Sequence, residues 1–137
     1  MFNTQTYVNR RTELRSLLKS GIILFLGNNE TPMNYPGNTF HFRQDSTFLY
    51  YFGLNYSGMA AVLDAEKGQD ILFADDIDIE DIIWMGVQPS VKDLAVKCGI
   101  TDTRPASGLS ELFVCFSLFE KLGPGHITPE VIFQRLC

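Results

Sequence analysis

A continuous apolar run, Ile22–Leu26, constrains the possible folds of this chain more than any other feature. It follows a segment in which Val8, Leu14 and Leu17 recur near helical spacing, and it ends at Gly27. A strand that is apolar at every position is typical of a sheet covered on both faces, as in α/β domains. The 137 residues, 45% of them hydrophobic, suffice for one compact domain with its own core. The sequence therefore predicts an α/β domain.

Apolar spacing and turn residues predict the other elements. Helices are expected from Thr4 or Thr6 to about Ser20, after the acidic segment 74–81, from Val91 to Cys98 between a Ser90 cap and Gly99, and from Gly108 to Leu122. Further strands are expected at 47–52, 59–63, 70–73 and 100–103. The tail 126–137 is expected to hold a brief strand and a last helical turn from Pro129 to Leu136. Strands 59–63 and 70–73 are close enough in sequence to form an antiparallel hairpin, so we expect a mixed sheet. Residues 30–39 contain two prolines and are expected to form an irregular loop.

The charge distribution argues against a nucleic-acid surface. The formal net charge is -5 and the sequence pI is about 4.9, whereas binding to phosphates requires clustered Lys and Arg. The densest basic group, Arg10, Arg11, Arg15 and Lys19, has helical spacing with Glu13 interleaved. We therefore expect it to be the solvated face of the first helix.

The cysteines indicate a reducing, cytoplasmic compartment. Cys98, Cys115 and Cys137 are odd in number and have no CxxC spacing, which supports neither a disulfide framework nor a zinc knuckle. Cys98 at a helix end and Cys115 within an apolar helix are expected to be inert thiols rather than nucleophiles. The first residues show no apolar leader before their charges, and no apolar run approaches the length of a membrane span. We expect neither export nor a membrane anchor.

The densest aromatic stretch is Asn38–Leu54, NTFHFRQDSTFLYYFGL, which surrounds a polar centre. In an extended chain Arg43 and Asp45 share one face, so they are expected to pair and to close the preceding loop. Direct contact of Arg43 with a ligand is the alternative. His41 is expected to be a strand residue that points away from its neighbouring rings, or else a polar contact for a partner.

Two candidate metal sites are weak in this sequence. The only histidines, His41 and His126, lie in different segments without zinc-ligand spacing. The acidic segment 74–81 lacks the central Gly and terminal Glu of a calcium-binding EF-hand loop. We expect its acids to be the solvated start of a helix, where negative charge suits the helix dipole.

Trp84 is the only tryptophan in the chain and lies just before Gly86. Such a ring either fills core space or projects from the end of an element, where it can anchor a partner or cover a substrate. The sequence leaves both interpretations open.

Five segments together resemble one family: RRTELRSLL, GIILFLGN, YPGNTFHFRQDSTFLYYFGL, LFADD and IIWMG. In order and spacing they are similar to the N-terminal domain of the aminopeptidase P and Xaa-Pro dipeptidase group, from about Tyr7 to about Leu112. The phrase FRQDS followed by F, Y and G at fixed offsets is the most specific part. The resemblance implies a creatinase-type N-terminal fold with a ribonuclease H-like motif, in which helices flank a mixed sheet of about six strands.

The resemblance also implies a function. In this family of hydrolases a separate pita-bread catalytic domain holds two metal ions, usually manganese, and removes the residue before proline. No catalytic or metal-binding residue of that domain can be placed in this chain, so the chain alone is expected to be inactive. The expected partners are its own catalytic domain, neighbouring subunits of a homo-oligomer and, in the full protein, a proline-containing peptide. Trp84 resembles an aromatic that reaches a neighbouring active site, and Arg43 resembles an organising structural residue.

The last residues differ from the family pattern. Residues 1–122 are expected to be the N-terminal domain, and 123–137 the start of a linker or an atypical tail, because GHITPEVIFQRLC departs from the usual linker toward a catalytic domain. A stand-alone interaction domain, a pseudo-enzyme with the same fold, is the main alternative. A self-contained hydrolase is a weaker one, since no catalytic constellation is found.

Overall fold

The computed structural model describes residues 2–112 and 132–133. Its elements, in chain order, are α1 (Thr4–Leu17), β1 (Ile22–Leu26), β2 (Pro32–Tyr35), β3 (Asn38–Thr39), α2 (Ser46–Phe52), β4 (Ala60–Asp64), β5 (Gln69–Phe73), α3 (Ile79–Met85), α4 (Val91–Cys98), β6 (Asp102–Arg104) and β7 (Ile132–Phe133). Residues 108–112 are also helical, and the rest of the helix predicted to reach residue 122 lies outside the described residues.

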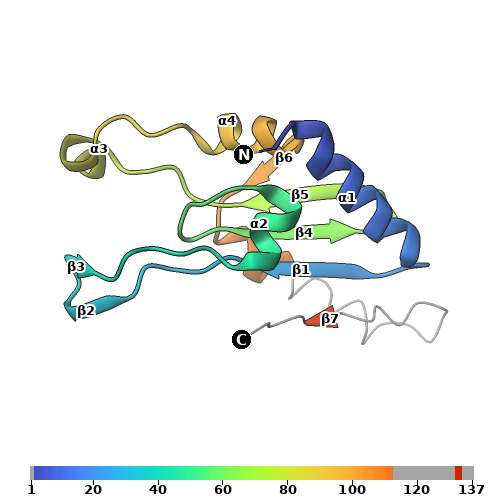
Figure 1. The fold of residues 1–137 in the computed structure, drawn as a ribbon, viewed down its shortest axis with the longest axis horizontal. Coiled ribbons are helices and arrows are strands. Elements are labelled where there is room, and N and C mark those ends of the chain that lie inside the picture. The colour runs from blue at the N-terminus through green and yellow to red at the C-terminus, as the bar shows by residue number, and fades with distance from the viewer. Residues whose placement is uncertain (1, 113–131, 134–137) are drawn as a thin grey trace.

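Five of the described strands form a mixed sheet in the order β6-β5-β4-β1-β7 (Figure 1). Strands β1, β4 and β5 are antiparallel neighbours, with Val62 opposite both Leu24 and Ile71. Strands β6 and β7 add parallel edges to β5 and β1. The predicted α/β class and mixed sheet are confirmed, and so is the predicted hairpin, because β4 and β5 are close in sequence and pair antiparallel.

Helices α1, α2 and α4 cover one face of the sheet (Figure 1). Alternate residues of β1, β4 and β5 point into this layer, while their neighbours face the other side and pack near Leu109 and Leu112. The first four residues of β1 are buried, as its apolar run predicts. The hydrophobic core between these helices and the sheet contains Ile23, Phe25, Phe48, Phe52, Leu54, Met59, Ala61, Leu63, Leu72, Ala74, Val91, Leu94, Ala95, Cys98 and Ile100.

The aromatic segment predicted as a strand at 47–52 is instead helix α2. Asp45 caps it by accepting a hydrogen bond from the Phe48 backbone N–H at 2.9 Å, and Gly53 ends it in the left-handed conformation at φ 67°. Phe48 and Phe52 are four residues apart, so a helix buries both on one face, and both are fully buried. Burial of this pair outweighs the preference of aromatic residues for strands.

The basic face of α1 was expected to be solvated, and for Arg11 this is wrong. Its side chain is only 1% exposed and donates hydrogen bonds to Asp70, to the Tyr51 carbonyl and to the Cys98 carbonyl. A buried guanidinium requires such partners, and these join α1, α2, α4 and β5. The cap of α1 is Asn3 rather than Thr4 or Thr6.

Helix α4 has the bounds predicted from the sequence. Ser90 and Asp93 form a capping box at its start, and Gly99 ends it at φ 76°. Strand β6 begins two residues later than the predicted 100–103. Strand β7 lies within 129–136, where a last helical turn was predicted, so that prediction is wrong for residues 132–133, which pair in parallel with β1 instead. Local start and stop signals were sufficient for α4.

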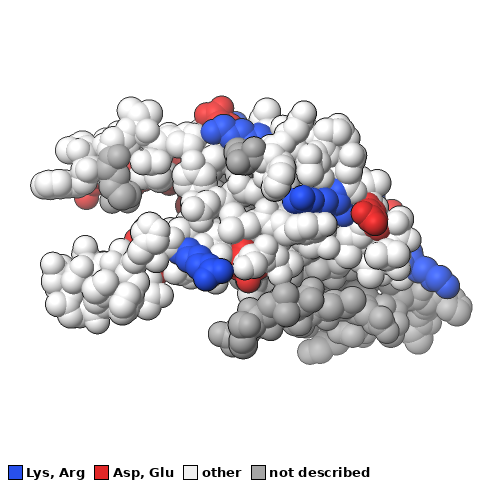
Figure 2. Space-filling view, in the orientation of Figure 1, with Lys and Arg blue, Asp and Glu red and all other residues white. Residues whose placement is uncertain are grey.

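Two segments project from the same end of the sheet (Figure 1). One, residues 30–42, was expected to begin as an irregular loop but contains the antiparallel pair β2–β3; we call it the ribbon arm. The other, residues 75–90, carries α3; we call it the helical arm. Figure 2 shows a notch between the two arms in the space-filling view.

Candidate functional site on the two projecting arms

Three aspartates of the helical arm accept hydrogen bonds from backbone N–H groups. Asp78 caps α3 by accepting a hydrogen bond from the Ile79 backbone N–H at 2.7 Å, and Gly86 ends the helix at φ 79°. This confirms that the acidic segment is the start of a helix. Asp75 and Asp76 accept hydrogen bonds from the backbone N–H groups of Ala106 and Val91. Each of these carboxylates therefore has a role in the local backbone structure.

The tip of the helical arm is apolar and exposed. Trp84 is 87% exposed and Val87 is 91% exposed, and Ile79 and Ile83 are also largely exposed. Of the two interpretations of Trp84, the structure therefore supports a projecting side chain and not a core residue. A contiguous set of large apolar side chains on a projecting element is characteristic of a contact surface.

The ribbon arm is also apolar at its surface. Met33, Tyr35 and Phe40 are each more than half exposed. Both arms extend beyond the end of the sheet (Figure 1), and both carry large exposed apolar side chains. Tyr and Trp are suited to contact surfaces because their rings bury large areas while retaining a polar group.

His41 and Arg43 are exposed on and beside the ribbon arm and line a shallow hollow of about 450 Å³ together with Glu30 and Phe42. The structure thus brings these two predicted site residues together. The predicted pair of Arg43 with Asp45 is not formed within residues 2–112: Asp45 is the α2 cap, and the Arg43 side chain is exposed to solvent. The extended geometry assumed for that pair is lost where α2 begins.

Gln44, not Arg43, is the buried polar residue of this segment. It is 1% exposed, its Nε2 donates to the Tyr56 carbonyl at 2.7 Å, and its Oε1 accepts from the Asn28 backbone N–H at 2.7 Å. One amide thus satisfies backbone groups of two loops, because it carries both a donor and an acceptor. The sequence signal was present, since Gln44 is an uncharged polar residue amid aromatic rings.

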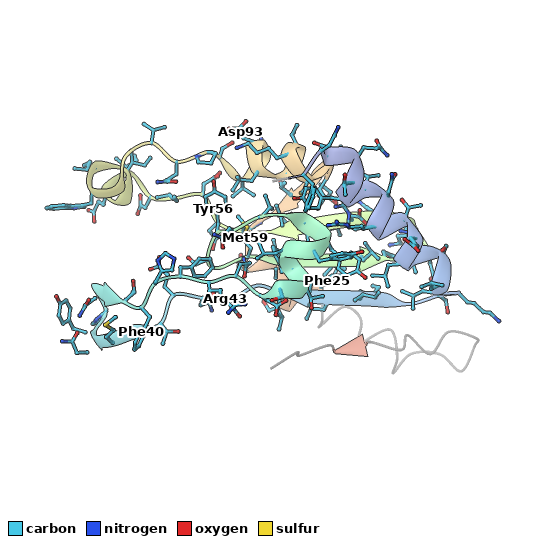
Figure 3. All side chains as sticks on the ribbon, in the orientation of Figure 1. Phe25, Phe40, Arg43, Tyr56, Met59 and Asp93 are labelled. Atoms are coloured by element: carbon cyan, nitrogen blue, oxygen red, sulfur yellow. The ribbon has the colours of Figure 1, made fainter. Side chains whose placement is uncertain are left out.

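A cleft of about 570 Å³ separates the arms at their base. Tyr56 and Met59 lie between the arms, as Figure 3 shows. Acids from both arms also line the cleft, including Glu30 and Asp78. The cleft is therefore lined by both acidic and apolar side chains.

The described part of the chain holds no group of three or more His, Cys, Asp or Glu side chains that could bind a metal ion. Cys98 is buried, and burial raises the pKa of its thiol to about 11, which favours the protonated thiol at neutral pH. Cys115, Cys137 and His126 lie outside the described residues. No helix among the described residues is long and apolar enough to cross a membrane.

Comparison with solved structures defines the class of domain. The fold is similar to aminopeptidase P from E. coli, with a TM-score of 0.72 and 22% identity over 85% of this chain and 27% of that chain. It is also similar to proline aminopeptidase P II from Yersinia pestis, with a TM-score of 0.71 and 21% identity over 84% of this chain and 27% of that chain. The structure is thus an α/β domain of the creatinase N-terminal type.

The family assignment comes from the sequence. Residues 7–116 match the family described as aminopeptidase P, N-terminal domain, and the chain belongs to this family. A probable Xaa-Pro aminopeptidase from Sordaria macrospora is 27% identical over 103 residues, 75% of this chain and 17% of that protein. Another from Metarhizium robertsii is 30% identical over 64 residues, 47% of this chain and 14% of that protein. The chain therefore spans a small part of these relatives.

Proposed function

We propose that this chain serves an Xaa-Pro aminopeptidase or dipeptidase as its non-catalytic N-terminal domain, contributing to oligomer assembly and to substrate access. The observation that carries the proposal is the 87% exposure of Trp84 at the tip of the helical arm. Membership of the aminopeptidase P N-terminal domain family gives the context. The parent enzyme removes the residue that precedes proline, and we place it in the cytoplasm.

The apolar surface at the tip of the helical arm favours contact with a second surface. Trp84, Ile83 and Val87 expose area whose burial against another surface is favourable by about 25 cal/mol per Å². Tryptophan is also among the residues that most often dominate binding energy at interfaces. A rigid wall beside an active site excludes folded substrates sterically, so an arm that docks on a neighbouring subunit narrows access to short peptide ends.

The metal ions expected for the family require a different set of residues. The described residues have no cluster of three metal-binding side chains, so they do not fit such a site. We propose that two metal ions, expected to be manganese, are held by a separate catalytic domain. In this proposal the residues of the two arms contact other surfaces and restrict substrate access, and they take no part in metal binding.

The test is Trp84→Ala in a full-length Xaa-Pro aminopeptidase that carries this domain. We expect kcat/KM for an Xaa-Pro peptide to fall at least about tenfold, as for a central interface residue. The melting temperature of the 137-residue chain is expected to change by less than about 2 °C, because an exposed ring contributes little to the core. The matched control is Val96→Ala, which removes an exposed apolar side chain from the outer face of α4.

Unchanged kcat/KM and unchanged oligomeric state in Trp84→Ala would refute the proposed role of the arm. A loss of several kcal/mol in domain stability would show instead that Trp84 supports the core. Cleavage of an Ala-Pro peptide by the 137-residue chain alone, abolished by a chelator, would contradict the non-catalytic assignment.

A stand-alone interaction domain with the same fold is the second candidate. The apolar side chains exposed on both arms, such as Tyr35 and Trp84, favour it because they suit any partner with an apolar surface. This candidate predicts that Trp84→Ala weakens binding of a partner protein without any effect on peptide hydrolysis.

A further inference from the structure

The direction of the helical arm is not fixed by packing of its tip. Ile79, Ile83, Trp84 and Val87 are all largely exposed, so these side chains bury little surface against the body of the domain. The arm leaves the sheet after β5 and returns at the start of α4 (Figure 1). Its direction therefore depends on how these two ends are held.

Asp76 joins the two ends. Its Oδ1 accepts a hydrogen bond at 2.8 Å from the backbone N–H of Val91, which is the first residue of α4 and lies fifteen positions further along the chain. Val91 itself is buried, so the bond ties the arm to a fixed part of the core. The bond closes the base of the arm into a loop.

The start of α4 needs this acceptor. The Ser90 hydroxyl accepts from the Asp93 backbone N–H at 3.2 Å, which leaves the Val91 N–H among the first-turn amides without a partner inside the helix. A carboxylate suits this position, because hydrogen bonds to an ionised group are short and strong and negative charge is favoured at a helix start. Asp75 makes a second tie, to the Ala106 backbone N–H at 3.0 Å, but this restrains only the end of the arm that follows β5.

We propose that Asp76 is a positioning residue that fixes the direction in which the helical arm presents Trp84. This inference rests on the proposed function, in which Trp84 contacts a second surface. Without the bond, the end that follows β5 is no longer tied to the start of α4, and the arm samples more orientations. A contact that requires one orientation of the arm is then weaker, because binding must also restrict the arm to that orientation, which costs conformational entropy.

The chain contains one tryptophan, so its tryptophan fluorescence reports on the helical arm alone. In the whole 137-residue chain, Asp76→Ala is expected to lower the fluorescence anisotropy of Trp84 while the melting temperature falls by no more than about 5 °C, the loss expected from one hydrogen bond at a helix start. Asp76→Asn keeps the Oδ1 acceptor and is expected to restore most of the anisotropy. The matched control is Asp64→Ala, which removes a carboxylate that accepts the Glu66 and Lys67 backbone N–H groups in the β4–β5 turn.

Two results would overturn the inference. Unchanged anisotropy in Asp76→Ala would show that the arm is held without this bond. Cooperative unfolding at a much lower temperature would show that Asp76 supports the fold rather than the arm.

A second experiment separates this inference from the proposed function. In a full-length Xaa-Pro aminopeptidase carrying the domain, Asp76→Ala is expected to lower kcat/KM by itself but to add nothing in a Trp84→Ala background, because both changes act through one contact. An equal further loss in that background would refute positioning through Trp84. If Trp84→Ala alone has no effect on hydrolysis or assembly, the proposed function fails, whereas the anisotropy result still decides what Asp76 does to the arm.

Discussion

Arg11 and Asp70 join the helical layer to the sheet: the Nε atom of Arg11 lies 2.7 Å from Oδ2 of Asp70, although the residues are 59 positions apart. Asp70 also pairs with Arg15, so one carboxylate of β5 neutralises two cations of α1. The remaining N–H groups of Arg11 donate to backbone carbonyls of Tyr51 and Cys98. This network ties α1, α2 and α4 to β5 of the sheet.

Arg11→Met is therefore expected to destabilise the domain by about 3 kcal/mol, because two backbone carbonyls and a largely buried carboxylate lose a partner. The measurement is urea unfolding followed by circular dichroism. Lys19→Met, which replaces an exposed cation just after the same helix, is the control and is expected to stay within about 0.5 kcal/mol. A loss below about 1 kcal/mol for Arg11→Met would contradict the structural role of this network.

Gln44 and Arg43 give the second prediction, because they are adjacent and differ in burial. Gln44→Ala is expected to cost about 2–3 kcal/mol, since it leaves the Asn28 N–H and the Tyr56 carbonyl without their partner. Arg43→Ala is expected to change stability by no more than about 0.5 kcal/mol, because its side chain is exposed. Thermal unfolding of both variants is the measurement. The reverse order of the two losses would reinstate Arg43 as the organising residue.

Elements with local signals were predictable from the sequence. The run Ile22–Leu26 is β1, and the Ser90 and Gly99 signals delimit α4 as predicted. Helix α2 was missed because Thr47–Phe52 consists of Thr, Leu and aromatic residues, which hides the four-residue spacing of the two buried phenylalanines. The intrinsic β-propensity of these residues favours a strand, but burial of Phe48 and Phe52 in the core stabilises a helix instead.

In the candidate site, too, features with a local sequence signal were predicted, whereas features that depend on distant contacts were missed. Trp84 was noticed because it precedes a glycine, but its exposure depends on an arm whose position the sequence does not encode locally. Gln44 and Arg11 were missed as organising residues because the contacts that give them this role are distant in sequence: Gln44 reaches Asn28 and Tyr56, 16 and 12 positions away, and the partners of Arg11 lie 40 to 88 positions away. Contacts at such separations leave no periodic pattern in a single sequence.

Gly53→Ala is expected to cost about 2–4 kcal/mol. Gly53 has φ 67°, and a Cβ atom there would lie 2.2 Å from the ring of buried Tyr7. The matched control is Gly68→Ala, because Gly68 has φ 66° but a Cβ atom there would meet no other atom within 4 Å. Gly68→Ala therefore reports the backbone strain alone, about 1 kcal/mol. Equal losses in urea unfolding of the two variants would show that Tyr7 does not exclude a side chain at position 53.

Cys98 gives the domain a predicted weakness at alkaline pH. Burial raises the pKa of its thiol from 9.0 to about 11, so between these values the unfolded chain loses a proton that the folded chain keeps. The contribution of this thiol is fully present below pH 9 and decreases as the pH rises, by as much as about 2–3 kcal/mol once both states are ionised. We expect the stability of Cys98→Ala, measured by urea unfolding, to fall less steeply than that of the wild type above pH 9.

The same burial predicts the reactivity of Cys98. At pH 8 the peptide that contains it is expected to stay unmodified by iodoacetamide in the folded chain and to be alkylated in urea, because the thiolate is the reactive species. Mass spectrometry of that peptide separates Cys98 from the two other cysteines. Tyr51, whose pKa is also raised by burial, is present in both the wild type and Cys98→Ala, so the difference between their pH profiles isolates the thiol. Parallel profiles above pH 9, or alkylation of Cys98 in the folded chain at the rate seen in urea, would show that its pKa is not raised by the fold.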